Sequence, residues 1–147
     1  MIEGFGDMGV SLSLAAVGSA LGTGQAGMAA LGAWKKCFLD NRPAPFILVA
    51  FVGMPLSQTI YGMILQNAIQ GANLPPESYP LQFLLGLLGG VAMGFSSWMQ
   101  GKAGANAADA YAETGQGFGN YIMVLGVIET VALFVMVFLI TAIPSGG

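Results

Sequence analysis

Glu129 is the only ionisable carboxylate in a nearly continuous apolar stretch, residues 118–143. The stretch reads FGNYIMVLGVIETVALFVMVFLITAI and is long enough to cross a bilayer as one helix. A charge at membrane depth costs roughly 2.5–3.5 kcal/mol on insertion scales, so such a residue usually faces protein and marks a transport pathway. We therefore expect other segments of the chain to supply polar partners for Glu129.

A second apolar segment, residues 46–69, has polar groups along one side. Pro55 lies inside it and is expected to distort the helix, because it frees the carbonyl four residues earlier, at Phe51. Polar side chains in a membrane often only link helices, but a polar stripe beside a proline favours a ligand site. Four positions spaced i, i+3, i+4 and i+7 share one helical face: Met54, Ser57, Gln58 and Tyr61.

A third segment, residues 81–108, places further polar side chains at membrane depth. At about 1.5 Å per residue, Gln58 and Glu129 each lie about 16–18 Å from the cytoplasmic end of their helices, and Gln100 lies about 12 Å from that end. The three side chains are therefore predicted to occupy one layer. Lys102 is expected to extend toward the cytoplasmic end, with a buried ion pair to Glu129 as the alternative. The polar positions are Ser96, Ser97, Gln100 and Lys102.

The composition is that of an integral membrane protein. Of 147 residues, 55% are hydrophobic and 7% are charged, whereas a soluble domain carries about a quarter charged residues. The length allows about four spans with short connections. Histidine is absent and Cys37 stands alone, which excludes a Cys/His zinc site, a disulfide framework and a Cys–His nucleophile within one chain. The net charge of −3 with no basic patch argues against a nucleic-acid partner.

Three of the four basic residues, Lys35, Lys36 and Arg42, lie in the connection 34–45. By the positive-inside rule this loop is cytoplasmic. The connection 109–117 is then also cytoplasmic, and both termini and the connection 71–80 are on the outer side. The spans predicted by this topology cover residues 8–33, 46–69, 81–108 and 118–143.

Small residues dominate the first and third spans. Gly18 and Gly22 form a small-xxx-small pair, which lets helix backbones approach closely in lipid. Gly24 and Gly27 are expected to extend this narrow surface. The third span has a matching smooth face, with glycine at every fourth position: Gly86, Gly90 and Gly94.

The chain reads as two duplicated helical hairpins, residues 1–70 and 71–147. GQAGMAALGAW in the first hairpin matches GKAGANAADAY in the second, with the same Gly or Ala at five positions. Gln58-Thr59 in the second span corresponds to Glu129-Thr130 in the fourth. Only the second hairpin therefore keeps the carboxylate, and the first has an amide in its place.

These features resemble the proteolipid (K or c) subunit in the rotor ring of V-type and V/A-type rotary ATPases. The resemblance rests on the duplicated hairpin, the Gly-rich first and third spans, and a single glutamate in the fourth. It covers nearly the whole chain. The segments PLSQTIYG, FSSWMQGKAGA and VIETVA resemble the family's motifs, and more closely those of its sodium-binding members.

The resemblance implies an all-α protein of four transmembrane helices that assembles into a homo-oligomeric ring. It also implies a stator membrane subunit, a central-stalk subunit at the cytoplasmic loops, and a soluble ATP-driven head. The chain itself is not expected to catalyse a reaction. The ion, Na⁺ or H⁺, would be carried by Glu129, and Tyr61 would hydrogen-bond to that carboxylate. The implied Na⁺ ligands are Glu129, Gln100, Gln58, Ser57 and the main-chain carbonyl of Met54.

Two alternatives stay open at the level of sequence. The first is the same rotor ring coupled to protons only, against which the polar set of Ser57, Gln58 and Gln100 argues. The second is a small four-helix ion-coupled transporter that works without an ATPase. The duplicated hairpin and the paired Gly-rich spans count against this second alternative.

Overall fold

The computed structural model describes residues 3–144, and every regular element within that range is helical. The predicted all-α fold class is confirmed. The elements are α1 (Val10–Leu39), α2 (Leu48–Gly53), the 3₁₀ turn η1 (Met54–Leu56), α3 (Ser57–Gly71), the 3₁₀ turn η2 (Pro76–Ser78), α4 (Tyr79–Thr114) and α5 (Phe118–Ala142).

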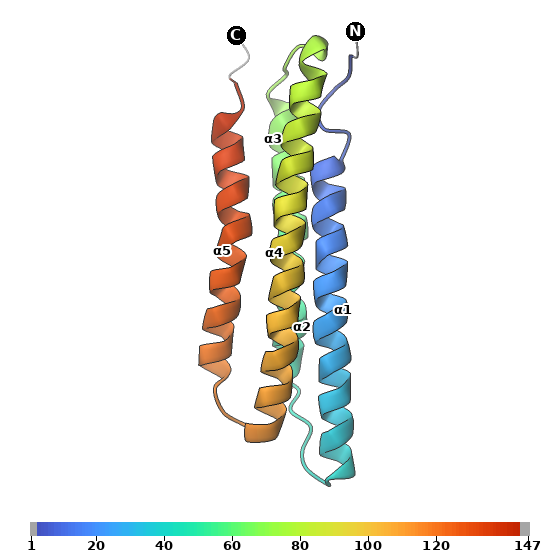
Figure 1. Cartoon of the computed structure of the whole chain (residues 1–147), viewed down its shortest axis with the longest axis vertical. Coiled ribbons are helices and arrows are strands. Elements are labelled where there is room, and N and C mark those ends of the chain that lie inside the picture. The colour runs from blue at the N-terminus through green and yellow to red at the C-terminus, as the bar shows by residue number, and fades with distance from the viewer. Residues whose placement is uncertain (1–2, 145–147) are drawn as a thin grey trace.

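The described residues form four helical segments long and apolar enough to span a membrane. They stand side by side in an up-and-down bundle, and the start of α1 and the end of α5 lie at the same end (Figure 1). α5 is the most apolar of them, with a mean hydropathy of 2.7 over its best window, and only 17% of that window is buried. A helix this apolar and this exposed needs lipid or another protein surface around it. The chain is an integral, multi-pass membrane protein.

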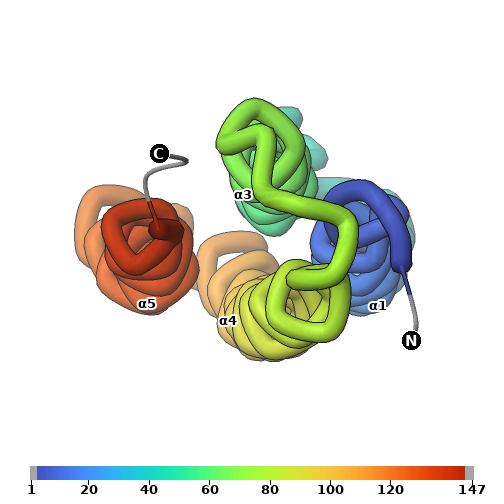
Figure 2. The backbone as a smooth tube through the Cα atoms, turned by 90° about the horizontal axis from the view of Figure 1, so that it is seen from above, coloured from blue at the N-terminus to red at the C-terminus, as the bar shows by residue number. Residues whose placement is uncertain are grey.

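α4 is the central helix of the bundle. Seen from above, α1 and α5 lie on opposite sides, with α4 and α3 between them (Figure 2). α4 makes its most extensive contact with α1 and also packs against α5, α3 and α2. The two hairpins therefore share one packed interior. Their origin by duplication stays a prediction.

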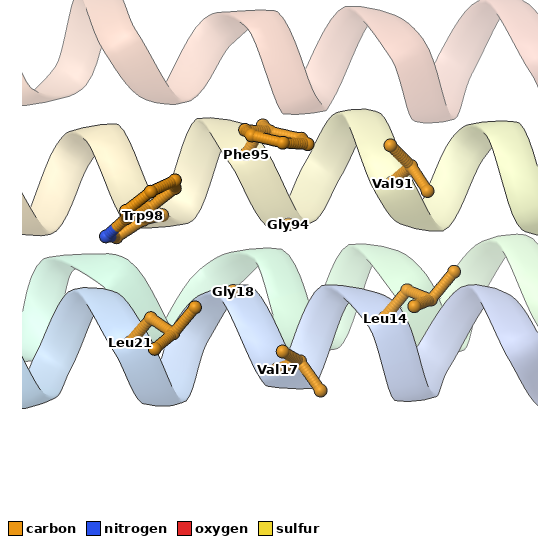
Figure 3. Close-up of a pocket in the computed structure, with 8 residues that line it drawn as sticks. All are labelled: Leu14, Val17, Gly18, Leu21, Val91, Gly94, Phe95 and Trp98. Carbon is orange, nitrogen blue, oxygen red and sulfur yellow. The ribbon is translucent and has the colours of Figure 1, made fainter.

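Glycines bring α1 and α4 into backbone contact. A Cβ atom on Gly18 would overlap the Gly94 carbonyl, and one on Gly101 would overlap the backbone of Gly22. Gly18 and Gly94 face each other beneath a shallow apolar hollow on the outside of this helix pair (Figure 3). The predicted close packing of Gly18 and Gly22 against α4 is confirmed, whereas Gly24 faces open space and Gly27 faces Val52 of α2.

Both helices that approach the predicted cytoplasmic end are longer than expected. α1 continues to Leu39 and α4 to Thr114, so the helices take up much of the predicted loops 34–45 and 109–117. Charged residues had suggested loops there. Instead Lys36 on α1 and Glu113 on α4 form an ion pair across the extended ends. The Arg42 guanidinium also donates a hydrogen bond to the Ala112 carbonyl, at 3.1 Å.

The second span, Leu48–Gly71, is interrupted as its proline predicts. α2 ends at Gly53, and Pro55 lies in the 3₁₀ turn η1 before α3 begins. Pro55 has no backbone N–H, so the Phe51 carbonyl lacks its usual helical hydrogen-bond donor. This carbonyl packs against Gly104 of α4, where a Cβ would be only 2.8 Å from the oxygen. The absence of a side chain at Gly104 gives the distorted turn room against α4.

Candidate functional site

Glu129 lies near the middle of α5 and is partly buried against the rest of the bundle. The Tyr61 hydroxyl on α3 donates a hydrogen bond to its Oε1 atom, at 2.7 Å. The Gln100 amide on α4 donates to its Oε2 atom, at 3.3 Å. Each carboxylate oxygen thus has a partner from a different helix, as expected for a carboxylate held within a membrane.

Gln100 links the other members of the site. Its side chain is fully buried, and its Nε2 also donates to the Leu125 carbonyl, one turn before Glu129, at 2.9 Å. Its Oε1 accepts a hydrogen bond from Nε2 of Gln58, at 2.8 Å. A buried amide that is satisfied on both sides has a fixed orientation, because turning it would leave polar atoms without partners.

Three oxygen atoms gather where η1 meets α3. The Ser57 hydroxyl lies 3.2 Å from the Met54 carbonyl oxygen and 3.3 Å from Oε1 of Gln58. Gln58 is fully buried, and Ser57 is partly buried. Carbonyl, hydroxyl and amide oxygens are the ligands that small hard cations prefer. This oxygen cluster joins Glu129 through the amides of Gln58 and Gln100.

The structure thus brings the predicted site residues into one hydrogen-bonded network across α3, α4, α5 and the turn η1. In the arrangement seen here the Gln100 carbonyl faces the amide nitrogen of Gln58. To serve as an ion ligand, it would exchange this hydrogen bond for the cation. The network comprises Met54, Ser57, Gln58, Tyr61, Gln100 and Glu129.

Lys102 takes no part in the site. Its ammonium lies over the ring of Trp98, 4.2 Å from the ring centroid, and its side chain is exposed. The alternative of an ion pair with Glu129 is wrong: between residues 3 and 144 the two ion pairs are Lys36–Glu113 and Arg42–Asp40. The cation–π contact is available because Trp98 and Lys102 are one helical turn apart.

A second buried carboxylate, Asp7, lies just before the start of α1, whereas the Lys36–Glu113 ion pair joins the C-terminal ends of α1 and α4. It accepts hydrogen bonds from the backbone N–H groups of Gly9 and Ser11, at 3.0 and 2.9 Å, and from the Ser11 hydroxyl. Gly86 of α4 leaves room for it, since a Cβ there would overlap the Asp7 side chain. Sequence reasoning missed this contact, although an acidic residue just before a helix is a known start signal.

Replacing Asp7 with Ala should lower the stability of the folded chain by about 1–3 kcal/mol, because buried N–H groups at the start of α1 lose their acceptor. The loss of helical circular dichroism during titration with a denaturing detergent measures this change. Glu3, which is exposed, provides the control. A stability for Asp7→Ala equal to that of Glu3→Ala would contradict the assigned contact.

The comparison with protein families finds a match over the second hairpin. Residues 83–142 match the model of the family described as the C subunit of ATP synthase. The matched segment includes most of α4 and all of α5, and so both Gln100 and Glu129. No curated protein matches the chain. The segment 83–142 is therefore similar in sequence to the C subunit of ATP synthase.

Proposed function

We propose that this chain is the proteolipid subunit of a V-type rotary ATPase and carries Na⁺ across the membrane on Glu129. One observation carries the proposal. The Glu129 carboxylate is held by Tyr61 and Gln100, and Gln100 connects it to the oxygen cluster at η1. The site thus joins one negative charge to several neutral oxygens, which is the composition that a monovalent cation requires.

Charge neutralisation explains how such a site moves an ion. Na⁺ bound at Glu129 makes a site without net charge, which can face lipid as the ring turns. Emptied, the carboxylate would cost roughly 2.5–3.5 kcal/mol at membrane depth, so rotation into lipid is allowed only with the site filled. A basic group on the stator would displace the ion where the site meets its exit path.

The oxygen cluster favours sodium over protons. A proton binds covalently to one carboxylate oxygen and needs only one further acceptor, whereas Na⁺ needs several oxygens at once. Ser57, Gln58 and the Met54 carbonyl would be superfluous in a site that handled only protons. Their convergence beside a break in the helix supports the sodium site.

We propose that copies of the chain assemble into a ring. A lone chain would expose the apolar faces of α5 and of the α1–α4 pair, and would leave the site partly open at its edge. Copies packed into a closed ring would cover part of these surfaces, and the rest of α5 would stay in contact with lipid. ATP hydrolysis or synthesis would be carried out by the soluble head, with a central stalk bound to the cytoplasmic loops.

Na⁺ should slow the labelling of Glu129 by a hydrophobic carbodiimide, because the reagent attacks the protonated carboxyl group and Na⁺ competes with the proton. The test follows the rate of adduct formation by mass spectrometry in purified protein, with Na⁺ varied against K⁺ at constant ionic strength. Ser57→Ala should weaken the protection about tenfold, through loss of one ligand, while the rate without Na⁺ stays unchanged. Labelling indifferent to Na⁺ at neutral and mildly alkaline pH would favour proton coupling.

A further inference from the structure

α4 carries two adjacent buried serines, Ser96 and Ser97, one turn before Gln100. Their exposed fractions are 7% and 0%. The Ser97 hydroxyl donates a hydrogen bond to the Pro55 carbonyl of η1, at 2.6 Å. The Ser96 hydroxyl donates to the Ile128 carbonyl of α5, at 3.0 Å. Neighbouring residues on one helix thus hold two different segments of the bundle.

These two bonds differ from the usual behaviour of a hydroxyl in a helix. Ser and Thr side chains commonly bond back to a carbonyl three or four residues earlier in their own helix. Thr23 and Thr130 do so in this protein, bonding to Ser19 and Val127 at 2.7 and 2.6 Å. Ser96 and Ser97 instead reach across to neighbouring elements, so their bonds fix how those elements lie relative to α4.

The two carbonyls that they bind lie next to the ion site. Pro55 is the middle residue of η1, directly after Met54. Ile128 directly precedes Glu129. Successive residues in a helix point about 100° apart, which lets one pair of serines reach both sides. α4 therefore holds the oxygen cluster with one serine and the carboxylate segment with the other, while Gln100 joins them.

Ser19 of α1 extends the contact on the Ser97 side. The two hydroxyls lie 3.2 Å apart, so Ser19 can donate to Ser97 while Ser97 donates to Pro55. Each buried hydroxyl in this relay then has a partner, which makes the Ser97 orientation definite. The position of η1 is thereby coupled to the close contact between α1 and α4.

We propose that Ser96 and Ser97 are positioning residues that set the spacing between Glu129 and the oxygens at η1, and so determine the affinity for Na⁺. The inference rests on the proposed function. Na⁺ must contact oxygens from both segments at once, so its affinity depends on their spacing. Protonation of Glu129 uses one carboxylate oxygen and does not depend on it.

The test compares two numbers in purified protein: the Na⁺ concentration that halves carbodiimide labelling of Glu129, and the labelling rate without Na⁺. In Ser97→Ala and in Ser96→Ala the half-protecting Na⁺ concentration should rise roughly tenfold. The labelling rate without Na⁺ should stay within about twofold of wild type. Thr130→Ala is the matched control. It removes a hydroxyl next to Glu129 that bonds only within α5, so it should shift neither number.

Ser97→Cys gives the same test where the alanine variant folds poorly, because a thiol has nearly the same size and is only a weak donor. The positioning role would be overturned if Ser96→Ala and Ser97→Cys needed the same Na⁺ concentration for half-protection as Thr130→Ala. The sodium proposal would still stand in that case. A wild-type protein without Na⁺ protection would overturn the sodium proposal, and the positioning role with it. If the labelling rate without Na⁺ changed as much as the half-protecting Na⁺ concentration, both serines would have only a general structural role.

Discussion

Glu129→Gln should abolish carbodiimide labelling of the chain and ATP-driven Na⁺ uptake by vesicles that contain the whole complex, both to background. Glutamine keeps the size of the side chain and one oxygen that can accept a hydrogen bond from Tyr61 or Gln100. It cannot compensate the charge of a bound cation. An uncompensated charge at membrane depth costs roughly 2.5–3.5 kcal/mol on insertion scales, so the loaded site would no longer pass through lipid.

Glu113→Gln is the matched control, since Glu113 is an exposed carboxylate in an ion pair with Lys36 at the end of the bundle. Exposed pairs contribute about 0–1 kcal/mol, so this variant should keep both labelling and uptake. If Glu129→Gln lost Na⁺ uptake but the chain were still labelled by the carbodiimide, the reactive carboxylate would be another residue. Uptake that persists in Glu129→Gln would contradict the proposed carrier.

The polar network was predictable to the extent that helical periodicity decides it. The spacing of Met54, Ser57, Gln58 and Tyr61 places them on one face, whichever helix they meet. Depth along the span then brings Glu129 into the same layer. Both inferences depend only on the rise and turn of a helix, and the structure confirms that these side chains lie together.

The positions of the helix ends were not predictable from charge. Lys35 and Lys36 suggested a loop, because a charged residue inside a span is costly. A helix that continues past the membrane surface meets no such penalty. Whether it continues depends on the contacts available beyond the membrane surface. Here Lys36 forms an ion pair with Glu113 on the equally extended α4. This partner is distant in sequence, so no local pattern reveals it.

The hydrogen-bond partners of single hydroxyl groups were likewise not predictable from the sequence. Ser96 and Ser97 were recognised as polar residues at membrane depth, but a serine can bond within its own helix or across to another. The choice is made by the acceptor nearby. The acceptors are the carbonyls of Pro55 in η1 and Ile128 in α5, two segments distant from α4 in the sequence.

Gly101→Ala should strongly destabilise the α1–α4 contact. A Cβ atom at this position would overlap the backbone of Gly22, which cannot turn aside as a flexible side chain does. Overpacking of this kind costs typically about 1–3 kcal/mol, and more where backbones must separate. The measurement is the free energy of unfolding from helical circular dichroism during titration with a denaturing detergent.

Gly32→Ala on α1 is the control, because a Cβ there meets nothing within 4 Å and alanine favours the helix by about 0.5–1 kcal/mol. Equal stability of Gly101→Ala and Gly32→Ala would contradict the backbone contact. Gly22→Ala adds a further distinction, since its Cβ would press on the Ser97 backbone and lie 2.9 Å from Cβ of Pro55. Because Pro55 lies in η1 and Ser97 binds its carbonyl, Gly22→Ala should weaken Na⁺ protection of Glu129 beyond its effect on stability. Gly32→Ala should leave that protection unchanged.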